Sequence, residues 1–117
     1  LAIQDYLASR DCTVLKARSG TDALQIALAV RPDLILMDIQ MPDMDGIETT
    51  RRLRSYAHMQ TVVIVALTAL AMPQDRERCL AAGMDDYMSK PVEFRKLAQL
   101  IEQHLTRGRP TSTLTMD

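Results

Sequence analysis

Continuous runs of apolar residues, separated by segments with helical spacing, predict an alternation of strands and helices along this chain. The stretches "LILM" at 34–37 and "VVIVAL" at 62–67 are apolar throughout, which is typical of parallel strands covered on both faces. "TVLKA" at 13–17 and the segment 85–90 are shorter strand candidates. This alternation predicts an α/β fold with a parallel sheet.

The segments between the predicted strands carry the end signals of helices. Ser19 or Thr21 can cap one helix, and Pro32 stops it. Asp45 can cap the next one, with Glu48 three residues on as its capping partner. The helices expected further along run from Gly46 to about Tyr56, from near Pro73 to Gly83 and from about Glu93 to Leu105, and residues 1–7 have the pattern of a helix end.

Composition and charge narrow the class of protein. The chain has 117 residues, 47% of them hydrophobic, and a net charge of −1, which is ordinary for one soluble domain and favours neither nucleic acid nor membrane as a direct partner. Two scattered cysteines and the lack of a membrane-length apolar run favour a cytoplasmic location. The arginines of 51–54 are interpreted as a solvated helix face. Residues 107–117 have little to bury and are predicted to be a linker or disordered tail, after a domain at 1–106.

A chemically useful polar residue stands at the end of three predicted strands. Asp38 follows 34–37, Thr68 follows 62–67, and Lys90 ends the last short strand. The carboxyl ends of parallel strands lie at one edge of a sheet, where α/β folds bind ligands. We therefore expect these three side chains to converge.

An acid, a hydroxyl and an ammonium at one edge suit phosphoryl chemistry. A carboxylate can act as the nucleophile toward a phosphoryl group, while Thr68 and Lys90 can hold phosphoryl oxygens. A Mg²⁺ ion normally uses one or two carboxylates together with phosphate and water. Asp38 and the backbone carbonyl of Gln40 are the expected metal ligands.

Three segments in order carry a family resemblance. "LILMDIQMPDMDG" at 34–46, "VVIVALTA" at 62–69 and "AAGMDDYMSKP" at 81–91 resemble the receiver domain of two-component response regulators. The wording of the first segment is most similar to receivers of hybrid sensor histidine kinases. The resemblance covers residues 1 to about 106 and implies a flavodoxin-like, doubly wound parallel sheet with helices on both faces.

The resemblance also implies roles and partners. Asp38 would be the phospho-acceptor, Thr68 the switch hydroxyl, Lys90 the phosphate-binding lysine and Tyr87 the aromatic residue that swings inward on activation. The implied donor is a histidine kinase or a histidine phosphotransfer domain, with Mg²⁺ as cofactor. Such a domain is not a classical enzyme on its own, although it takes part in its own phosphorylation and dephosphorylation. A homodimer through the face of residues 73–106 is a further expectation.

One departure from the family pattern stands out. Receivers begin with a strand that ends in an acidic pair, and those acids help to bind Mg²⁺. That strand is normally central, between the counterparts of 13–17 and 34–37, and the sequence shows neither the strand nor the acids before its first helix. We therefore expect an N-terminally incomplete receiver with the first strand absent. If the chain starts at Leu1, weak Mg²⁺ binding and poor phosphorylation should follow.

Two other functions stay open. A pseudo-receiver, never phosphorylated, would act only as a protein-interaction module; the missing acids favour it, and the presence of Asp38, Thr68 and Lys90 opposes it. A phosphatase with an aspartate nucleophile would need a second acid beside the nucleophile and a cap over the substrate. The chain has Asp43 and Asp45 but no cap segment.

Overall fold

The computed structural model describes residues 12–40, 44–69, 73–90, 93–104 and 111–116. The helix end expected at 1–7 lies outside these residues. Across the described ranges, none of the helices combines the length and the apolar character needed to cross a membrane.

The described residues form one five-stranded sheet in which every neighbouring pair is parallel, with the order β1-β5-β2-β3-β4. Its strands are β1 (Cys12–Ala17), β2 (Leu34–Asp38), β3 (Val63–Thr68), β4 (Asp86–Ser89) and β5 (Thr111–Met116). The helices are α2 (Gly20–Val30), α3 (Gly46–Arg54), the short 3₁₀ helix η1 (Ala57–Met59), α4 (Pro73–Ala82) and α5 (Phe94–His104).

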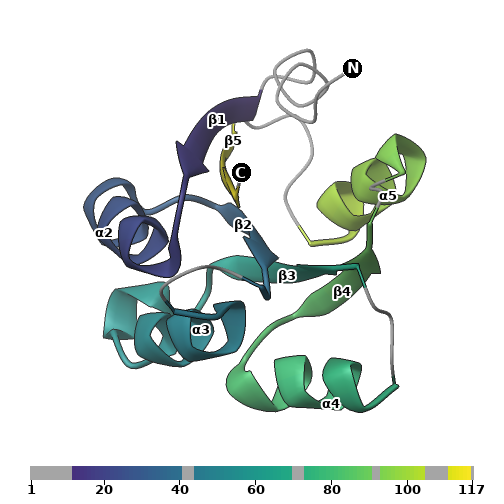
Figure 1. Ribbon diagram of the computed structural model, residues 1–117. Helices are drawn as coiled ribbons and strands as arrows, with labels where there is room; N and C mark the ends of the chain where they lie inside the picture. The colour runs from purple at the N-terminus through teal and green to yellow at the C-terminus, as the bar shows by residue number, and fades with distance from the viewer. Residues whose placement is uncertain (1–11, 41–43, 70–72, 91–92, 105–110, 117) are drawn as a thin grey trace.

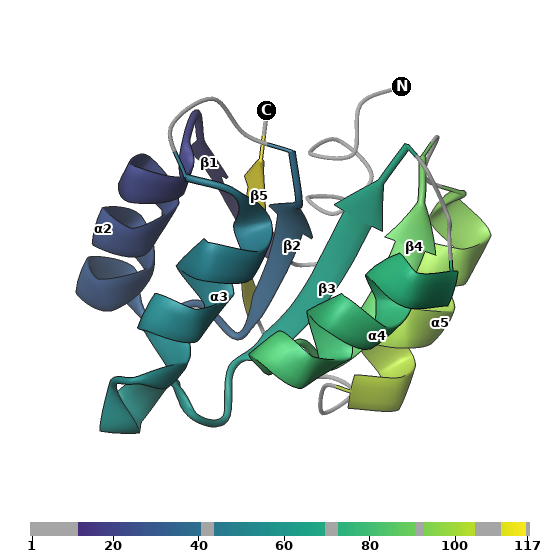
Figure 2. The same cartoon turned by 60° about the horizontal axis from the view of Figure 1, so that its bottom comes forward.

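Helices α2, α3 and α4 cover one face of the sheet and α5 covers the other, as Figures 1 and 2 show from two directions. The buried apolar residues accordingly form two clusters. One cluster joins Leu53 of α3 and Cys79 of α4 to the sheet, and the second joins Leu97 of α5 to Leu36 of β2. The α/β, flavodoxin-like architecture predicted from the sequence is confirmed, because β2 and β3 are indeed apolar strands covered on both faces.

Local signals in the sequence explain where the helices begin and end. The Ser19 hydroxyl accepts a hydrogen bond from the Asp22 N–H at 3.1 Å and starts α2. The Asp45 carboxylate accepts one from the Glu48 N–H at 2.8 Å and starts α3. Gly83 follows the last residue of α4 with a φ of 109°, a conformation that glycine adopts at little cost.

The C-terminal segment departs from the prediction. Residues 111–116 are not a linker or disordered tail: they form β5, which lies between β1 and β2 (Figure 1). The position between β1 and β2, which the first strand holds in the family, is thus filled by β5. Backbone N–H and C=O groups of interior strands must be paired, and β5 pairs them although most of its own side chains are polar.

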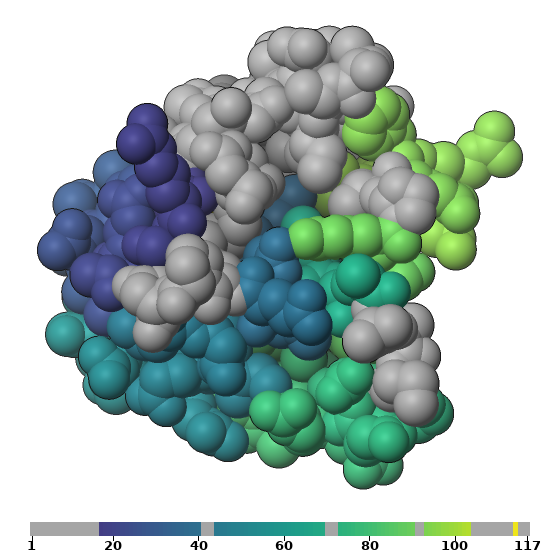
Figure 3. All heavy atoms as spheres, viewed as in Figure 1, coloured from purple at the N-terminus to yellow at the C-terminus, as the bar shows by residue number. Residues whose placement is uncertain are grey.

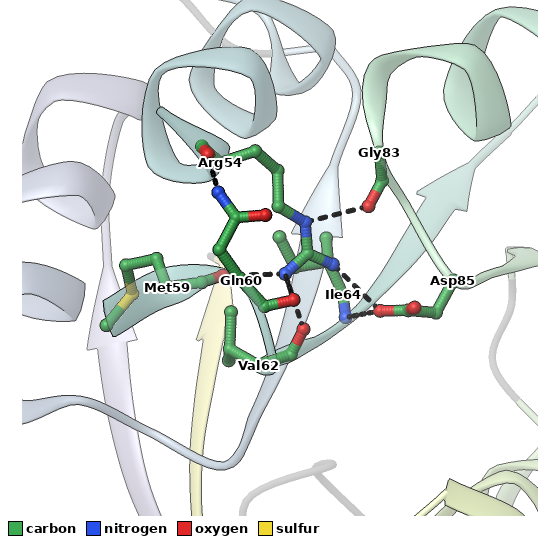
Figure 4. A network of polar contacts seen from close by, with 7 residues as sticks. All are labelled: Arg54, Met59, Gln60, Val62, Ile64, Gly83 and Asp85. Carbon is green, nitrogen blue, oxygen red and sulfur yellow. Dashed lines mark hydrogen bonds and ion pairs between the residues drawn. The ribbon is translucent and has the colours of Figure 1, made fainter. Parts of the chain in front are cut away.

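A second departure concerns Arg54 at the end of α3, which is not part of a solvated helix face. Its guanidinium donates through Nε to the Gly83 carbonyl at 2.9 Å and through Nη1 to the Met59 and Val62 carbonyls, both at 2.8 Å. Its Nη2 pairs with the Asp85 carboxylate at 2.9 Å. Figure 4 shows these contacts around a side chain that is 15% exposed. We call this set of contacts the Arg54 clasp.

The clasp joins segments that are distant in the sequence. The same Asp85 oxygen that contacts Arg54 accepts a hydrogen bond from the Ile64 N–H at 2.8 Å, near the start of β3 (Figure 4). A Cβ atom at Gly83 would lie 2.9 Å from the Arg54 side chain, so only glycine leaves room there. The clasp therefore fixes the start of β3 and the approach to β4 against the end of α3.

Truncating the buried side chain of β5 tests its place in the sheet. Leu114 is 0% exposed and belongs to the core cluster beneath α2 and α3. Leu114→Ala should lower the free energy of unfolding by about 2–5 kcal/mol, because it removes buried methyl groups and leaves a cavity. Urea unfolding measures the change, with Val30→Ala, 49% exposed in wild type, as the control. Equal small losses for both variants would mean that β5 is not in the core.

Replacing the guanidinium of Arg54 by the ammonium of lysine tests the clasp. Arg54→Lys should lower the free energy of unfolding by about 2–4 kcal/mol, because a lysine cannot serve acceptors that surround a planar guanidinium. The matched control is Arg52→Lys on the same helix, whose ion pair with Glu48 is 56% and 45% exposed and should contribute less than about 0.5 kcal/mol. Similar losses in the two variants would contradict a structural role for Arg54.

Candidate functional site

The sheet register brings together the three polar residues predicted at the strand ends. Asp38 is paired with Leu67, next to Thr68, and Thr68 is paired with Ser89, next to Lys90. Two backbone hydrogen bonds continue the ladder beyond the strands, from the Ile39 N–H to the Leu67 carbonyl at 3.2 Å and from the Lys90 N–H to the Thr68 carbonyl at 2.7 Å. The predicted convergence is confirmed, whereas the chemical role of each residue stays a prediction.

An ion pair lies at the centre of this edge. The Lys90 ammonium contacts Oδ2 of Asp38, and the Gln40 N–H donates to Oδ1 of the same carboxylate at 2.9 Å. The Asp38 side chain is 14% exposed and that of Lys90 is 41% exposed, while Thr68 is buried. Figure 3 looks onto this edge, where the blue end of β2 and the green end of β4 meet near the middle of the face. Asp38 is thus held in one orientation and can still be reached from solvent.

The start of α3 packs tightly against the backbone of Asp38. The Gly46 N–H donates to the Ile39 carbonyl at 3.3 Å. A Cβ atom at position 46 would lie 2.6 Å from the Asp38 carbonyl oxygen and 2.9 Å from Ile39 Cα. Glycine is therefore required for this approach, which brings the amino terminus of α3, with its positive partial charge, close to the acid.

A surface depression of about 540 Å³ opens beside these residues, within the size range of small-ligand sites. Sequence reasoning missed two of its charged residues, Asp75 and Arg78 of α4, which form an ion pair at 3.6 Å. The sequence did show that Asp75 and Arg78 are three residues apart on a predicted helix and so share one helix face. It did not indicate that this face points toward the carboxyl ends of the strands. The lining residues are Ile39, Gln40, Asp45, Ile47, Thr68, Asp75 and Arg78.

Tyr87 lies on β4, three residues before Lys90. It is half-buried and packs against the core cluster that includes Cys79. Loss of contact with water raises the pKa of Tyr87, and the negative charge of Asp75 raises it further. Burial is also the main reason that the pKa of the Cys79 thiol is raised. Both groups therefore stay protonated and neutral around neutral pH.

The described donors suit a metal ion that keeps much of its water. Across the described ranges, no group of three or more His, Cys, Asp or Glu side chains could enclose a metal ion. Asp38 supplies one carboxylate at the site, and Gln40 follows it at the rim of the depression. Mg²⁺ commonly binds proteins through one or two carboxylates plus water and phosphate, so the fit is to a loosely held ion.

The sequence of this chain is similar to that of known proteins. Residues 1–102 match the family model of the response regulator receiver domain. The polar-differentiation response regulator DivK of Brucella anthropi is 35% identical over 102 residues, which are 87% of this chain and 83% of that protein.

Solved structures agree with the family match. The receiver domain of a sensor histidine kinase from Pseudomonas aeruginosa, described with a magnesium ion coordinated in its active site cleft, is 38% identical with a TM-score of 0.79, over 87% of this chain and 84% of that one. The receiver domain of a histidine kinase from Syntrophus aciditrophicus is 31% identical with a TM-score of 0.79, over 93% and 83% of the two chains. The chain belongs to the response regulator receiver domains, the phosphoryl-accepting switches of two-component signalling systems.

Proposed function

We propose that this receiver takes a phosphoryl group onto the carboxylate of Asp38 from a phosphohistidine on a histidine kinase or phosphotransfer domain. The observation that carries the proposal is the convergence of Asp38, Thr68 and Lys90 at one sheet edge, with an ion pair between the acid and the lysine. A cytoplasmic location follows from such a donor, since its phosphohistidine is made with ATP.

The geometry suggests how the transfer proceeds. One oxygen of Asp38 attacks the phosphorus, the bond from phosphorus to the imidazole nitrogen breaks, and that nitrogen leaves with the electron pair. The Gln40 N–H holds Oδ1, so the carboxylate cannot rotate freely. The Lys90 ammonium and the Thr68 hydroxyl then hold phosphoryl oxygens and offset the charge that develops on them.

Asp38 and the backbone carbonyl of Gln40 would hold a Mg²⁺ ion beside the phosphoryl group. When bound, the ion supplies positive charge that lowers the repulsion between the carboxylate and the incoming phosphoryl oxygens. Asp38 would in this way both bind the ion and accept the phosphoryl group, while the Lys90 ammonium would offset negative charge at the same carboxylate.

Phosphorylation would change the partner surface through Thr68 and Tyr87. The modification brings the local charge to roughly −1.5 to −2. The hydroxyl of Thr68 is on the neighbouring strand β3, and the half-buried Tyr87 is on β4, the next strand beyond it. Movement of these two side chains would reshape the surface of α4, β4 and α5, a two-state change driven by local electrostatics. A homodimer through residues 73–106 would use this same surface.

A pseudo-receiver remains the second candidate. The observation that favours it is that the described residues hold no group of three or more His, Cys, Asp or Glu side chains able to enclose a metal ion. In that case the same α4, β4 and α5 surface would bind a partner without any phosphorylation.

Removing the acceptor tests the main proposal. Asp38→Asn should abolish the acid-labile, hydroxylamine-sensitive modification formed with acetyl phosphate or a phosphorylated kinase, because an amide is a poor nucleophile. Intact mass spectrometry measures the added phosphoryl group. The control is Asp33→Asn, just before the amino end of β2, which should be modified normally. Modification of Asp38→Asn would show that another residue is the acceptor, and no modification of wild type would favour the pseudo-receiver.

Removing the lysine tests the charge balance. Lys90→Ala should slow phosphorylation of Asp38 by about 10²-fold, the usual effect of deleting one group that stabilises developing charge. Lys96→Ala is the matched control, since Lys96 is 67% exposed and contacts only Glu93 at 3.8 Å among the described pairs. Equal rates for both variants would contradict a role for Lys90 in transfer.

Titration with Mg²⁺ tests whether Asp38 and the Gln40 carbonyl are its ligands. Because Asp38 is the one carboxylate among the two proposed ligands, Mg²⁺ should bind weakly and Asp38→Asn should remove the binding. Titration followed by NMR shifts of the Gln40 amide reads the site directly. Tight binding by wild type would mean that donors outside the described residues complete it.

A further inference from the structure

Gly20, the first residue of α2, packs directly against the segment that enters α3. The two helices lie side by side in Figures 1 and 2. A Cβ atom at position 20 would lie 2.6 Å from the Met44 carbonyl oxygen, 2.6 Å from Thr49 Oγ1 and 2.9 Å from Met44 Cβ. Non-bonded carbon atoms normally stay about 3.5–4.0 Å apart. Glycine is a poor helix former, so this close approach explains why it stands here.

The atoms that Gly20 contacts hold the start of α3. Thr49 is fully buried, and its hydroxyl donates to the Asp45 carbonyl at 2.9 Å. The Thr49 N–H donates to the same carbonyl at 3.0 Å. Asp45 is the residue that caps α3, and Met44 comes directly before it. Gly20 therefore sets how closely α2 approaches the first turn of α3.

A second glycine contact connects the start of α3 to the acid. Gly46 lies against the Asp38 carbonyl oxygen and Ile39 Cα so closely that a Cβ atom does not fit. Its N–H also donates to the Ile39 carbonyl. Two successive contacts thus run from Gly20 to the backbone of Asp38. One residue further on, the Gln40 N–H holds the Asp38 carboxylate at 2.9 Å.

We propose that Gly20 is a positioning residue for the Asp38 carboxylate, acting through the first turn of α3. Close-packed interiors transmit strain, so a displaced α3 start would move the Asp38 backbone and turn its side chain. A misplacement of about 1 Å that originates far from the reacting atoms can lower a rate by roughly 10²-fold. The inference rests on the proposed function, because its effect on phosphoryl transfer requires Asp38 to be the acceptor.

NMR of Gly20→Ala in the full chain tests the positioning without any phosphorylation. The added methyl group should displace the start of α3. The amide signals of Gly46 and Gln40 should therefore shift, because their N–H groups bond to the Ile39 carbonyl and to the Asp38 carboxylate. Unmoved signals from both amides in folded protein would overturn the proposal.

Two controls separate this effect from a general loss of packing. The Gly83 amide is the internal reference, since it donates to the Leu80 carbonyl at the end of α4 and should keep its shift. Ala27→Gly is the matched variant, because it also changes one methyl group at a fully buried position of α2. It should move the Gly46 and Gln40 signals far less than Gly20→Ala does.

The rate of phosphorylation gives the second readout, with acetyl phosphate and Mg²⁺ as reagents and intact mass as the measurement. Gly20→Ala should lower the maximal rate by about 10-fold. The acetyl phosphate concentration that gives half of that rate should change little, because Lys90 and Thr68 are still present to hold the donor. A maximal rate equal to that of Ala27→Gly would overturn the proposal.

A second-site change checks that the contact itself is responsible. Thr49→Ala removes one of the two oxygen atoms that the new methyl group would meet, while the position-49 N–H remains to bond the Asp45 carbonyl. Added to Gly20→Ala, it should restore part of the rate and move the Gly46 amide back toward wild type. If Gly20→Ala does not fold, the double variant is compared with Thr49→Ala alone and should show the same two changes in smaller measure.

Failure of the positioning and failure of the proposed function give different results. If wild type is not modified by acetyl phosphate, the proposed function is contradicted. In that case the amide shifts of Gly46 and Gln40 alone decide whether Gly20 positions the acid. Modified wild type with unmoved amides in Gly20→Ala contradicts only the positioning.

Discussion

The backbone of β2 needs a hydrogen-bonded strand on each side, and the arrangement of the site depends on how that need is met. All five residues of β2 pair with β3, and its first three, Leu34 to Leu36, also pair with β5. Parallel pairing fixes the register of the strand ends, so Asp38 is carried to the same edge as Thr68 and Lys90. A slip of one residue in β2 would turn Asp38 toward the opposite face of the sheet.

Charge and burial act together at that edge. Removing an acid from water is costly unless it is paired and hydrogen-bonded, and Asp38 has both a lysine and a backbone N–H as partners. The same contacts orient the carboxylate, and they leave the ammonium beside the place that an incoming phosphoryl group would occupy. One ion pair therefore stabilises the site and, under the proposed function, also prepares it for the incoming phosphoryl group.

The amino end of β3 is held by structural contacts, whereas its carboxyl end lies at the candidate site. At the amino end, the Arg54 clasp ties α3 to Gly83 and Asp85, and Asp85 holds the Ile64 N–H (Figure 4). At the carboxyl end, Thr68 adjoins the acid–lysine pair and a surface depression. Because the amino end is fixed by many directional contacts, the rearrangement that we propose to follow phosphorylation is favoured at the carboxyl end.

The sequence by itself determined the α/β class, the helix caps at Ser19 and Asp45, and the placing of Asp38, Thr68 and Lys90 at strand ends, because apolar periodicity and capping are local properties. Tertiary structure alone decided the role of 111–116, whose polar residues form a strand only where two neighbours offer unpaired backbone. It likewise decided that Arg54, unlike its helix neighbour Arg52, turns inward to acceptors up to 31 residues away. Local pattern does not encode which distant carbonyls a side chain will meet.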